Sequence, residues 1–233
     1  MNKKLDYVSA SKLRLFLECP QKLYYKYVEG IEEEEKTVMI IGKAFHERIL
    51  EGKNDEAFES LSKTYKSRID EMQEALEREP LWKPGKLEKA EYEFDVKMKN
   101  GTTVKVIIDR LGEFNGENAI VELKSTGNLQ RWDWWFAENS LQPYIYPYAY
   151  WLKTGKILPF YFVIVTFDPK PKCKFFRKQC TEDDFKLLEE QLTLLQNSID
   201  TEMWAADPQE RKCQECPYFR ECPAARQKEY YSF

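Results

Sequence analysis

The stretch VKVIIDRLGEFNGENAIVELKST, from Val104 to Thr126, constrains the fold more than any other part of the chain. It opens with a β-branched run that predicts a strand, and we expect this strand to end at Asp109. Residues 113–118 carry Asn and Gly, which adopt turn conformations at low cost. Residues 119–124 then alternate as a second strand, so the sequence predicts a β-hairpin.

The alternation of the second strand separates two faces. Ala119, Val121 and Leu123 point to one side, whereas Glu122 and Lys124 share the other with Ile120. The hairpin partner brings Asp109 beside this pair. Grouped carboxylates cost stability unless something compensates them, and Mg²⁺ or Mn²⁺ suits their oxygens, with a lysine to orient or activate a water. The plainer alternative is an exposed face of solvated charges.

Composition fits a globular protein with one sizeable core. The 233 residues are 42% hydrophobic and 33% charged, and no apolar run approaches the length of a membrane span. The N-terminus lacks the apolar centre of a signal peptide, so we expect a cytoplasmic location without membrane attachment. A net charge of −4 argues against general binding of polyanions but not against a local basic groove. We expect a single domain of three parts: helical 1–88, core 89–203 and tail 204–233.

Periodicity and capping residues predict the elements around the hairpin. Ser9 or Ser11 begins a first helix, which is broken or kinked at Cys19-Pro20. Asn100-Gly101 is a hairpin turn, and Thr181 caps the last long helix. The other expected elements are helices over 38–51, 55–78 and 182–201, a helix around 142–147 kinked by Pro147, and strands over 91–99, 159–167 and 173–179.

His46 is the only histidine of the chain and lies in the predicted helix 38–51. A single histidine is more often structural or exposed than a metal ligand. Gly42 precedes it by four residues and therefore shares its helical face, which would let another backbone approach the imidazole closely.

Aromatic residues gather after Lys124. They could stack on unpaired nucleic-acid bases, or they could simply pack the core against a helix, which is the more common use of such residues. The residues concerned are Trp132, Trp134, Trp135, Tyr144, Tyr148 and Trp151.

The tail carries three cysteines, Cys213, Cys216 and Cys222, with the spacing C-x2-C-x5-C. Six cysteines in a chain without an export signal favour a metal or cluster over disulfides. Cys19 is the fourth candidate ligand because Pro follows it, as Pro also follows Cys216 and Cys222. Four thiolates fit zinc or an iron–sulfur cluster equally well on spacing alone. We treat Cys173 and Cys180 as structural.

Taken together, these pieces resemble the RecB-like nucleases of the PD-(D/E)XK superfamily, in the branch that carries an iron–sulfur cluster. That branch includes the AddB-type nuclease domain and small CRISPR-adaptation exonucleases. The resemblance spans nearly the whole chain, with its motifs in the family order. The matching segments are the opening SASKLRLFLECPQKLYYKY, GKAFHERI, IID, ELK, LQPYIY and the three tail cysteines. Pro143 and Pro147 depart from the usual helix of the fifth segment.

The resemblance implies an α/β fold with a mixed central sheet flanked by helices, and a nuclease that requires Mg²⁺ or Mn²⁺. It makes His46, Asp109, Glu122 and the carbonyl of Leu123 the metal ligands. Lys124 would orient or activate the attacking water, and Gln142 and Tyr146 would position substrate or lysine. A [4Fe–4S] cluster, with zinc as the alternative, would bind Cys19, Cys213, Cys216 and Cys222.

For function, the resemblance implies an exonuclease for single-stranded DNA or DNA ends in CRISPR adaptation, antiviral defence, recombination or repair. Partners would include CRISPR integrase proteins or a helicase. A different class of function is a non-catalytic adaptor that binds DNA ends inside a larger complex. A third, a zinc-stapled structural protein, leaves the set His46, Asp109, Glu122 and Lys124 unexplained.

Overall fold

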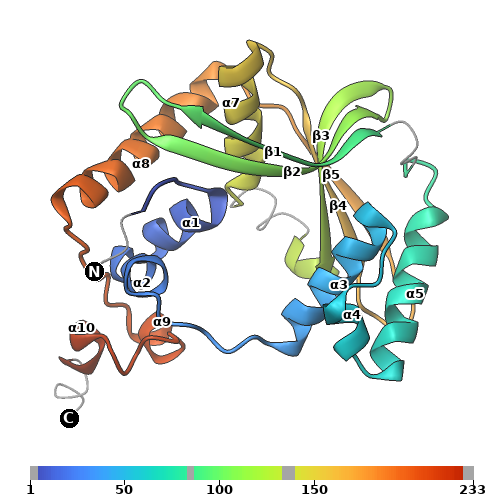
Figure 1. Ribbon diagram of the computed structural model, residues 1–233, viewed down its shortest axis with the longest axis horizontal. Coiled ribbons are helices and arrows are strands. Elements are labelled where there is room, and N and C mark those ends of the chain that lie inside the picture. Colours follow the sequence, from blue (N-terminus) through green and yellow to red (C-terminus); the bar gives the residue numbers. More distant parts are fainter. Residues whose placement is uncertain (1–4, 83–86, 133–139, 228–233) are drawn as a thin grey trace. The chain divides into compact units, whose positions relative to one another are not determined.

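The computed structural model describes residues 5–82, 87–132 and 140–227 (Figure 1). The chain forms two compact units. One comprises Glu35–Val96 and Lys105–Phe185; the other comprises the residues up to Glu34, the segment Lys97–Val104, and the residues from Lys186 onward. The predicted division into three parts of a single domain stays a prediction, and each unit is described by itself.

A mixed five-stranded sheet dominates the first unit, with the strand order β1-β2-β3-β4-β5. The pair β2–β3 is antiparallel, β3–β4 is parallel, and β4–β5 is antiparallel. A parallel pair requires a crossover connection, and this one contains the 3-10 helix η3 and the helix α7. The strands are β1 (Leu87–Lys97), β2 (Thr103–Phe114), β3 (Glu117–Thr126), β4 (Phe160–Thr166) and β5 (Cys173–Lys178).

The predicted hairpin is confirmed, but the expected strand end at Asp109 is wrong. Strand β2 continues through Asp109 to Phe114, with the turn at Asn115 and Gly116. Its ladder with β3 covers only the stretch from Phe114 back to Arg110, which pairs with Val121. Before that point β2 lies with β1, and the two curve away from β3 (Figure 1). Asp109 therefore sits where the two strands separate, a position that depends on sheet curvature.

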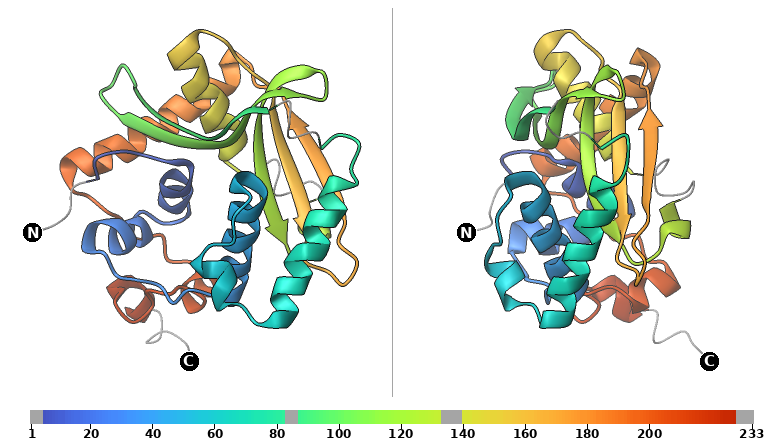
Figure 2. Two further views of the ribbon diagram at one scale, coloured as in Figure 1. Left: turned by 45° about the vertical axis from the view of Figure 1, so that its right-hand side comes forward. Right: turned by 90° about the vertical axis from the view of Figure 1, so that its right-hand side faces the viewer.

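The two faces of the sheet follow the predicted alternation. One face packs against helices α3 (Thr37–Glu51) and α5 (Lys63–Glu77), which lie together along β3 to β5 (Figure 2). This apolar core takes alternate residues from the central strands β3 and β4. From β3 and β4 it includes Ala119, Val121, Leu123, Tyr161, Val163 and Val165.

The single helix expected over 55–78 is wrong, because two helices occupy this stretch. Helix α4 (Glu56–Ser60) begins at Asp55, whose side chain accepts the Phe58 N–H at 2.8 Å. Leu61 then adopts an extended conformation, with ψ 149°, before α5 starts. Leu61 is buried in the core, so tertiary packing outweighs the continuous helical periodicity of the sequence.

The remaining elements of the first unit include α7 (Gln142–Thr154), with Pro147 inside it, and η3 (Leu129–Trp132). The last long helix, α8, runs over Glu182–Thr201 as predicted. At its start, the Thr181 N–H and hydroxyl both donate to Oδ2 of Asp184, which is the reciprocal half of a capping box.

The second unit begins with α1 (Ala10–Glu18), capped by Ser9, whose side chain accepts the Lys12 N–H. The expected break at Cys19-Pro20 is confirmed: Cys19 is extended, with φ −171°, and α2 starts at Pro20. This unit also contains the turn at Asn100-Gly101, where Gly101 has φ +91°. Besides α8 from Lys186 onward, its other described helices are α2 (Pro20–Leu23), the π-helix η1 (Tyr24–Glu29), α9 (Glu210–Gln214) and α10 (Pro223–Gln227).

Candidate active site

Three elements of the first unit bring His46, Asp109 and Leu123 together. Nε2 of His46, from α3, lies 2.8 Å from Oδ2 of Asp109. The same carboxylate oxygen accepts the backbone N–H of Leu123 at 2.7 Å. Because the β2–β3 ladder has ended here, the Asp109 side chain satisfies a strand N–H. The sequence motif thus forms a fixed junction between α3, β2 and β3.

Glu122 is the most deeply buried carboxylate of the group, with 2% of its surface exposed. Its Oε1 accepts hydrogen bonds from Nζ of Lys124 and from Nε2 of Gln142, each at 2.5 Å. Its Oε2 is buried without a hydrogen-bond partner. A buried carboxylate oxygen in this state is costly, and a divalent cation would satisfy it. The chemistry of the donor set therefore fits a hard metal ion.

Helix α7 supports Glu122 from the side of the sheet opposite to the α3–α5 core. Gln142 follows Leu141, the N-cap of α7, and its Nε2 also donates to the Tyr146 hydroxyl at 3.0 Å, one helical turn along. Tyr146 is 8% exposed and packs edge-on against Phe160. The structure thus brings the six predicted side chains, from His46 to Tyr146, together in two hydrogen-bonded groups. These groups adjoin where Glu122 and Leu123 follow one another in β3.

Burial and neighbouring charges shift the pKa values of the side chains in the site. Burial, followed by the charge of Asp109, raises the pKa of Glu122 to about 7. Burial lowers the pKa of His46, but the hydrogen bond and charge of Asp109 outweigh it, so the His46 pKa lies above its ordinary value. Burial also lowers the pKa of Lys124, yet the charges of Glu122 and Asp109 prevail and raise it. The negative charge of the site therefore favours the protonated form of both basic groups while no metal is bound.

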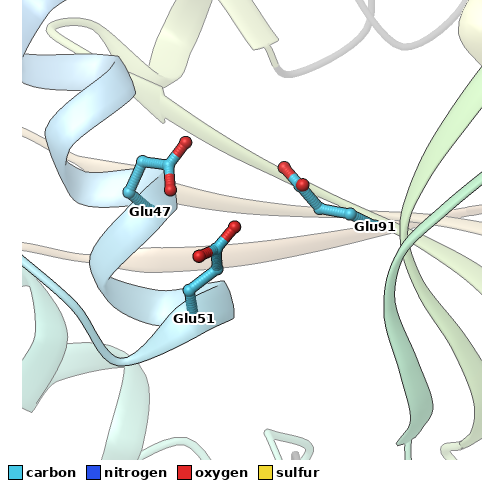
Figure 3. Close-up of side chains that lie close together, drawn as sticks. All are labelled: Glu47, Glu51 and Glu91. Atoms are coloured by element: carbon cyan, nitrogen blue, oxygen red, sulfur yellow. The ribbon is translucent and has the colours of Figure 1, made fainter. Parts of the chain in front are cut away.

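Three further carboxylates form a separate cluster, and two of them lie on the same helix as His46. Glu47 and Glu51 of α3 point toward Glu91 of β1, with one oxygen from each within 4.8 Å of the others (Figure 3). Glu51 and Glu91 are exposed. Burial, followed by the negative charges of Glu51 and Glu91, raises the pKa of Glu47. The i, i+4 spacing of Glu47 and Glu51 was the only sequence signal for this group.

The four predicted cluster cysteines line one pocket of the second unit, together with mostly apolar atoms. Sγ of Cys19 accepts the N–H of Asp207 at 3.4 Å, a backbone contact of the kind that stabilises thiolates. Nearby contacts join the two ends of the chain: the Tyr218 hydroxyl donates to Glu33 at 2.7 Å and the Tyr25 hydroxyl to the Glu221 carbonyl at 3.1 Å. The cysteines in the pocket are Cys19, Cys213, Cys216 and Cys222.

Core packing accounts for Cys180 and for three of the described aromatic residues, whereas Tyr144 is only partly buried. The Cys180 thiol is buried and donates to the Pro143 carbonyl at 3.1 Å. Trp132 is 7% exposed and Tyr148 1% exposed, and Trp151 packs on a phenylalanine of α8 with ring centroids 5.4 Å apart. Core packing therefore accounts for these three rings. Two other residues of the set, Trp134 and Trp135, lie outside the described residues.

Sequence reasoning missed two residues that hold this junction in place. Arg110 donates to the carbonyls of Ile49 and Leu50 at the end of α3, at 3.3 and 2.6 Å. Ser125, directly after Lys124, lies against Gly42 of α3. The only sequence signal for Arg110 was a charged residue inside an apolar strand, and Ser125 gave none.

Comparison with solved structures finds the same fold in other proteins. A Eubacterium rectale protein provisionally designated an exonuclease matches with a TM-score of 0.73 and 16% identity, over 95% of this chain and 88% of its own. The structure of a protein named SSO0001 matches with a TM-score of 0.52 and 14% identity, over 97% of this chain and 90% of its own. At such identities these likenesses concern the fold alone, and they agree with the predicted α/β architecture.

Sequence comparison gives the family. A search of curated proteins found no match. No helix in the described part of the chain is long and apolar enough to cross a membrane. The family model described as the PD-(D/E)XK nuclease superfamily matches residues 7–223, which is nearly the whole chain. The match includes Asp109, Glu122 and Lys124 as well as the four cysteines that line the pocket. Nucleases of this superfamily typically use divalent metals such as Mg²⁺, and the buried, unpartnered oxygen of Glu122 agrees with this match. The chain belongs to the PD-(D/E)XK nuclease superfamily.

Proposed function

We propose that this protein is a deoxyribonuclease dependent on Mg²⁺ or Mn²⁺, and an exonuclease acting on single-stranded DNA or on DNA ends. The observation that carries this proposal is the buried Oε2 of Glu122, which has no partner although it lies beside Asp109 and Lys124. In a protein that binds no metal, replacing this carboxylate with an apolar side chain would increase stability, because it would remove an uncompensated buried charge. A bound cation explains why the charge is kept.

Each residue of the site has its own role in the proposed reaction. His46, Asp109, Glu122 and the Leu123 carbonyl would hold the metal. A metal bound there would supply Lewis-acid stabilisation of the charge that develops on the scissile phosphate and leaving oxygen. Lys124 would orient or activate the attacking water. Gln142 holds Oε1 of Glu122 and so leaves Oε2 for the cation, with Tyr146 bracing the Gln142 amide.

The cysteine pocket supports a second part of the proposal. Cys19, Cys213, Cys216 and Cys222 would bind an iron–sulfur cluster, with [4Fe–4S] favoured over zinc by the family resemblance. The cluster would join the two ends of the chain and so close a loop of nearly its full length, which is a structural role. Absorption across the visible range, with iron and sulfide analysis of anaerobically purified protein, separates cluster from zinc.

The experiment for the nuclease is degradation of end-labelled single- and double-stranded DNA with Mg²⁺ or Mn²⁺. Wild type is compared with Lys124→Ala and with the matched control Lys53→Ala, an exposed lysine that pairs with Glu51. We expect metal-dependent cleavage that only Lys124→Ala abolishes, and a product ladder that gives polarity. A folded wild type that binds DNA but cuts none would instead support the adaptor function.

The same resemblance supports a proposal for the biological setting. We propose a role in CRISPR adaptation, antiviral defence or DNA repair, with integrase proteins or a helicase as partners. Co-purification of tagged protein from cells that encode a CRISPR array, compared with cells in which the array is deleted, tests this part.

A further inference from the structure

Helix α3 is attached to the sheet on both sides of His46. Gly42 precedes His46 by four residues, and the carbonyls of Ile49 and Leu50 follow it by three and four. Each contact therefore lies about one helical turn from the imidazole. Both reach residues next to the candidate site: Gly42 meets Ser125, and the two carbonyls meet Arg110.

The first contact leaves little room for a side chain at position 42. A Cβ atom placed on Gly42 would lie 3.2 Å from Oγ of Ser125, closer than ordinary van der Waals contact. Gly42 is helical, so its backbone conformation suits alanine as well, and the crowding against Ser125 is the one cost of an added Cβ that the structure shows. Glycine inside a helix costs about 1 kcal/mol relative to alanine, and close packing against Ser125 offsets this cost.

The second contact uses the end of the helix. The last carbonyls of a helix lack partners within it and form the negative end of its dipole. The Arg110 guanidinium donates to two of them, at 3.3 and 2.6 Å. Arg110 directly follows Asp109 in β2. The residue that binds the end of α3 is therefore the neighbour of the residue that contacts His46. Arg110 is paired with Val121, which lies in the core on the α3 side of the sheet.

We propose that the Gly42–Ser125 contact and the Arg110 cap form a two-point clamp that sets the position of His46 relative to Asp109. This inference rests on the proposed function, because it makes Gly42, Ser125 and Arg110 positioning residues for the metal site. None of the three touches the reacting atoms. A shift of α3 by a few tenths of an ångström at either point would change the 2.8 Å contact between Nε2 and Oδ2.

The sole histidine provides a direct readout. With one histidine in the sequence, the imidazole Cε1–H gives a single resonance in the NMR spectrum. We follow this resonance in full-length protein without DNA, first metal-free and then during titration with Mg²⁺ alone. The variants are Gly42→Ala, Gly42→Ala with Ser125→Ala, and Arg110→Gln. The matched control is Gly127→Ala, where no atom lies within 4 Å of the added Cβ.

We expect Gly42→Ala and Arg110→Gln to move the metal-free His46 resonance and to weaken Mg²⁺ binding by about 10-fold, as removal of supporting contacts does at other metal sites. In the double variant with Gly42→Ala, Ser125→Ala should restore the wild-type His46 resonance and the wild-type Mg²⁺ affinity, because it removes the crowded Oγ. Gly127→Ala should behave as wild type. The thermal midpoint of Gly42→Ala should be unchanged or higher, since alanine favours the helix.

Three results would overturn the clamp: a wild-type His46 resonance in both Gly42→Ala and Arg110→Gln, no recovery on adding Ser125→Ala, or the same loss in Gly127→Ala. If Mg²⁺ leaves the His46 resonance of the wild type unchanged, the proposed metal site is wrong. The metal-free spectra of Gly42→Ala, with and without Ser125→Ala, then still test the clamp. If the resonance responds and the rescue works but DNA stays intact, the nuclease proposal fails and the clamp stands.

Discussion

Lys124 Nζ and Glu122 Oε1 lie 2.5 Å apart on the same face of β3, two residues apart in the chain, while Oε2 of the same carboxylate stays buried without a partner. One oxygen of Glu122 is therefore held by the protein and the other is available to a ligand. This division of roles within one side chain leads to the first two predictions.

Glu122→Gln should abolish metal-dependent cleavage while leaving the metal-free protein folded. The amide keeps the volume and one hydrogen-bonding oxygen, but it removes the charge that a cation needs, and we expect a loss of at least about 100-fold, or roughly 3 kcal/mol. Because a buried charge beside Asp109 is removed, the metal-free thermal midpoint should not fall. A large drop in this midpoint would instead give Glu122 a structural role.

Gln142→Ala should cost more activity than Tyr146→Phe. Gln142 bonds Glu122 directly, and loss of such a supporting contact typically costs 10- to 100-fold in metal affinity or activity. Tyr146 acts only through the Gln142 amide, so we expect a loss below about 10-fold. Cleavage rates measured over a series of Mg²⁺ concentrations test this order. Equal losses in the two variants would contradict it.

Cys222→Ser should remove the visible absorption and lower the thermal midpoint, because the pocket that joins the chain ends loses a ligand. Cys180→Ser is the matched control, since a serine hydroxyl can still donate to the Pro143 carbonyl. We expect iron and sulfide content to fall only in Cys222→Ser. Unchanged iron content in that variant would remove Cys222 from the ligand set.

Acid stability should depend on Glu117. Hydrogen bonds from Arg177, followed by that from Tyr161, lower the pKa of Glu117 to about 2. Since this folded-state pKa lies below the ordinary value of 4.5, the stabilisation is present above about pH 4.5 and is lost as the pH falls toward 2. Urea midpoints of wild type and Glu117→Gln should therefore differ at pH 7 and converge near pH 2.

The control for this pH series is Glu74→Gln, which changes a largely exposed glutamate of α5. Its urea midpoint should stay close to that of wild type throughout. Arg177 and Glu117 are both partly exposed, so solvent screening keeps the difference at pH 7 small. A constant difference between wild type and Glu117→Gln down to pH 2 would contradict the assignment.

Local signals in the sequence were sufficient for several features. Alternation in β3 correctly separated Ala119, Val121 and Leu123 from Glu122 and Lys124, because successive strand residues must point to opposite sides. The Cys19-Pro20 break and the start of α8 after Thr181 also depend only on neighbouring residues. Side-chain period and capping are short-range properties, so the sequence by itself determined them.

Other features required the tertiary structure. Asp109 lies within a continuous strand, at the point where β2 leaves β3, and nothing local to it marks that divergence. Leu61 interrupts a continuous helical pattern because the core buries it. The orphaned oxygen of Glu122 and the seat of α3 on Arg110 and Ser125 both arise from segments distant in sequence. Only packing decides such contacts, since their free energy comes from the neighbours that folding supplies and not from the residue types alone.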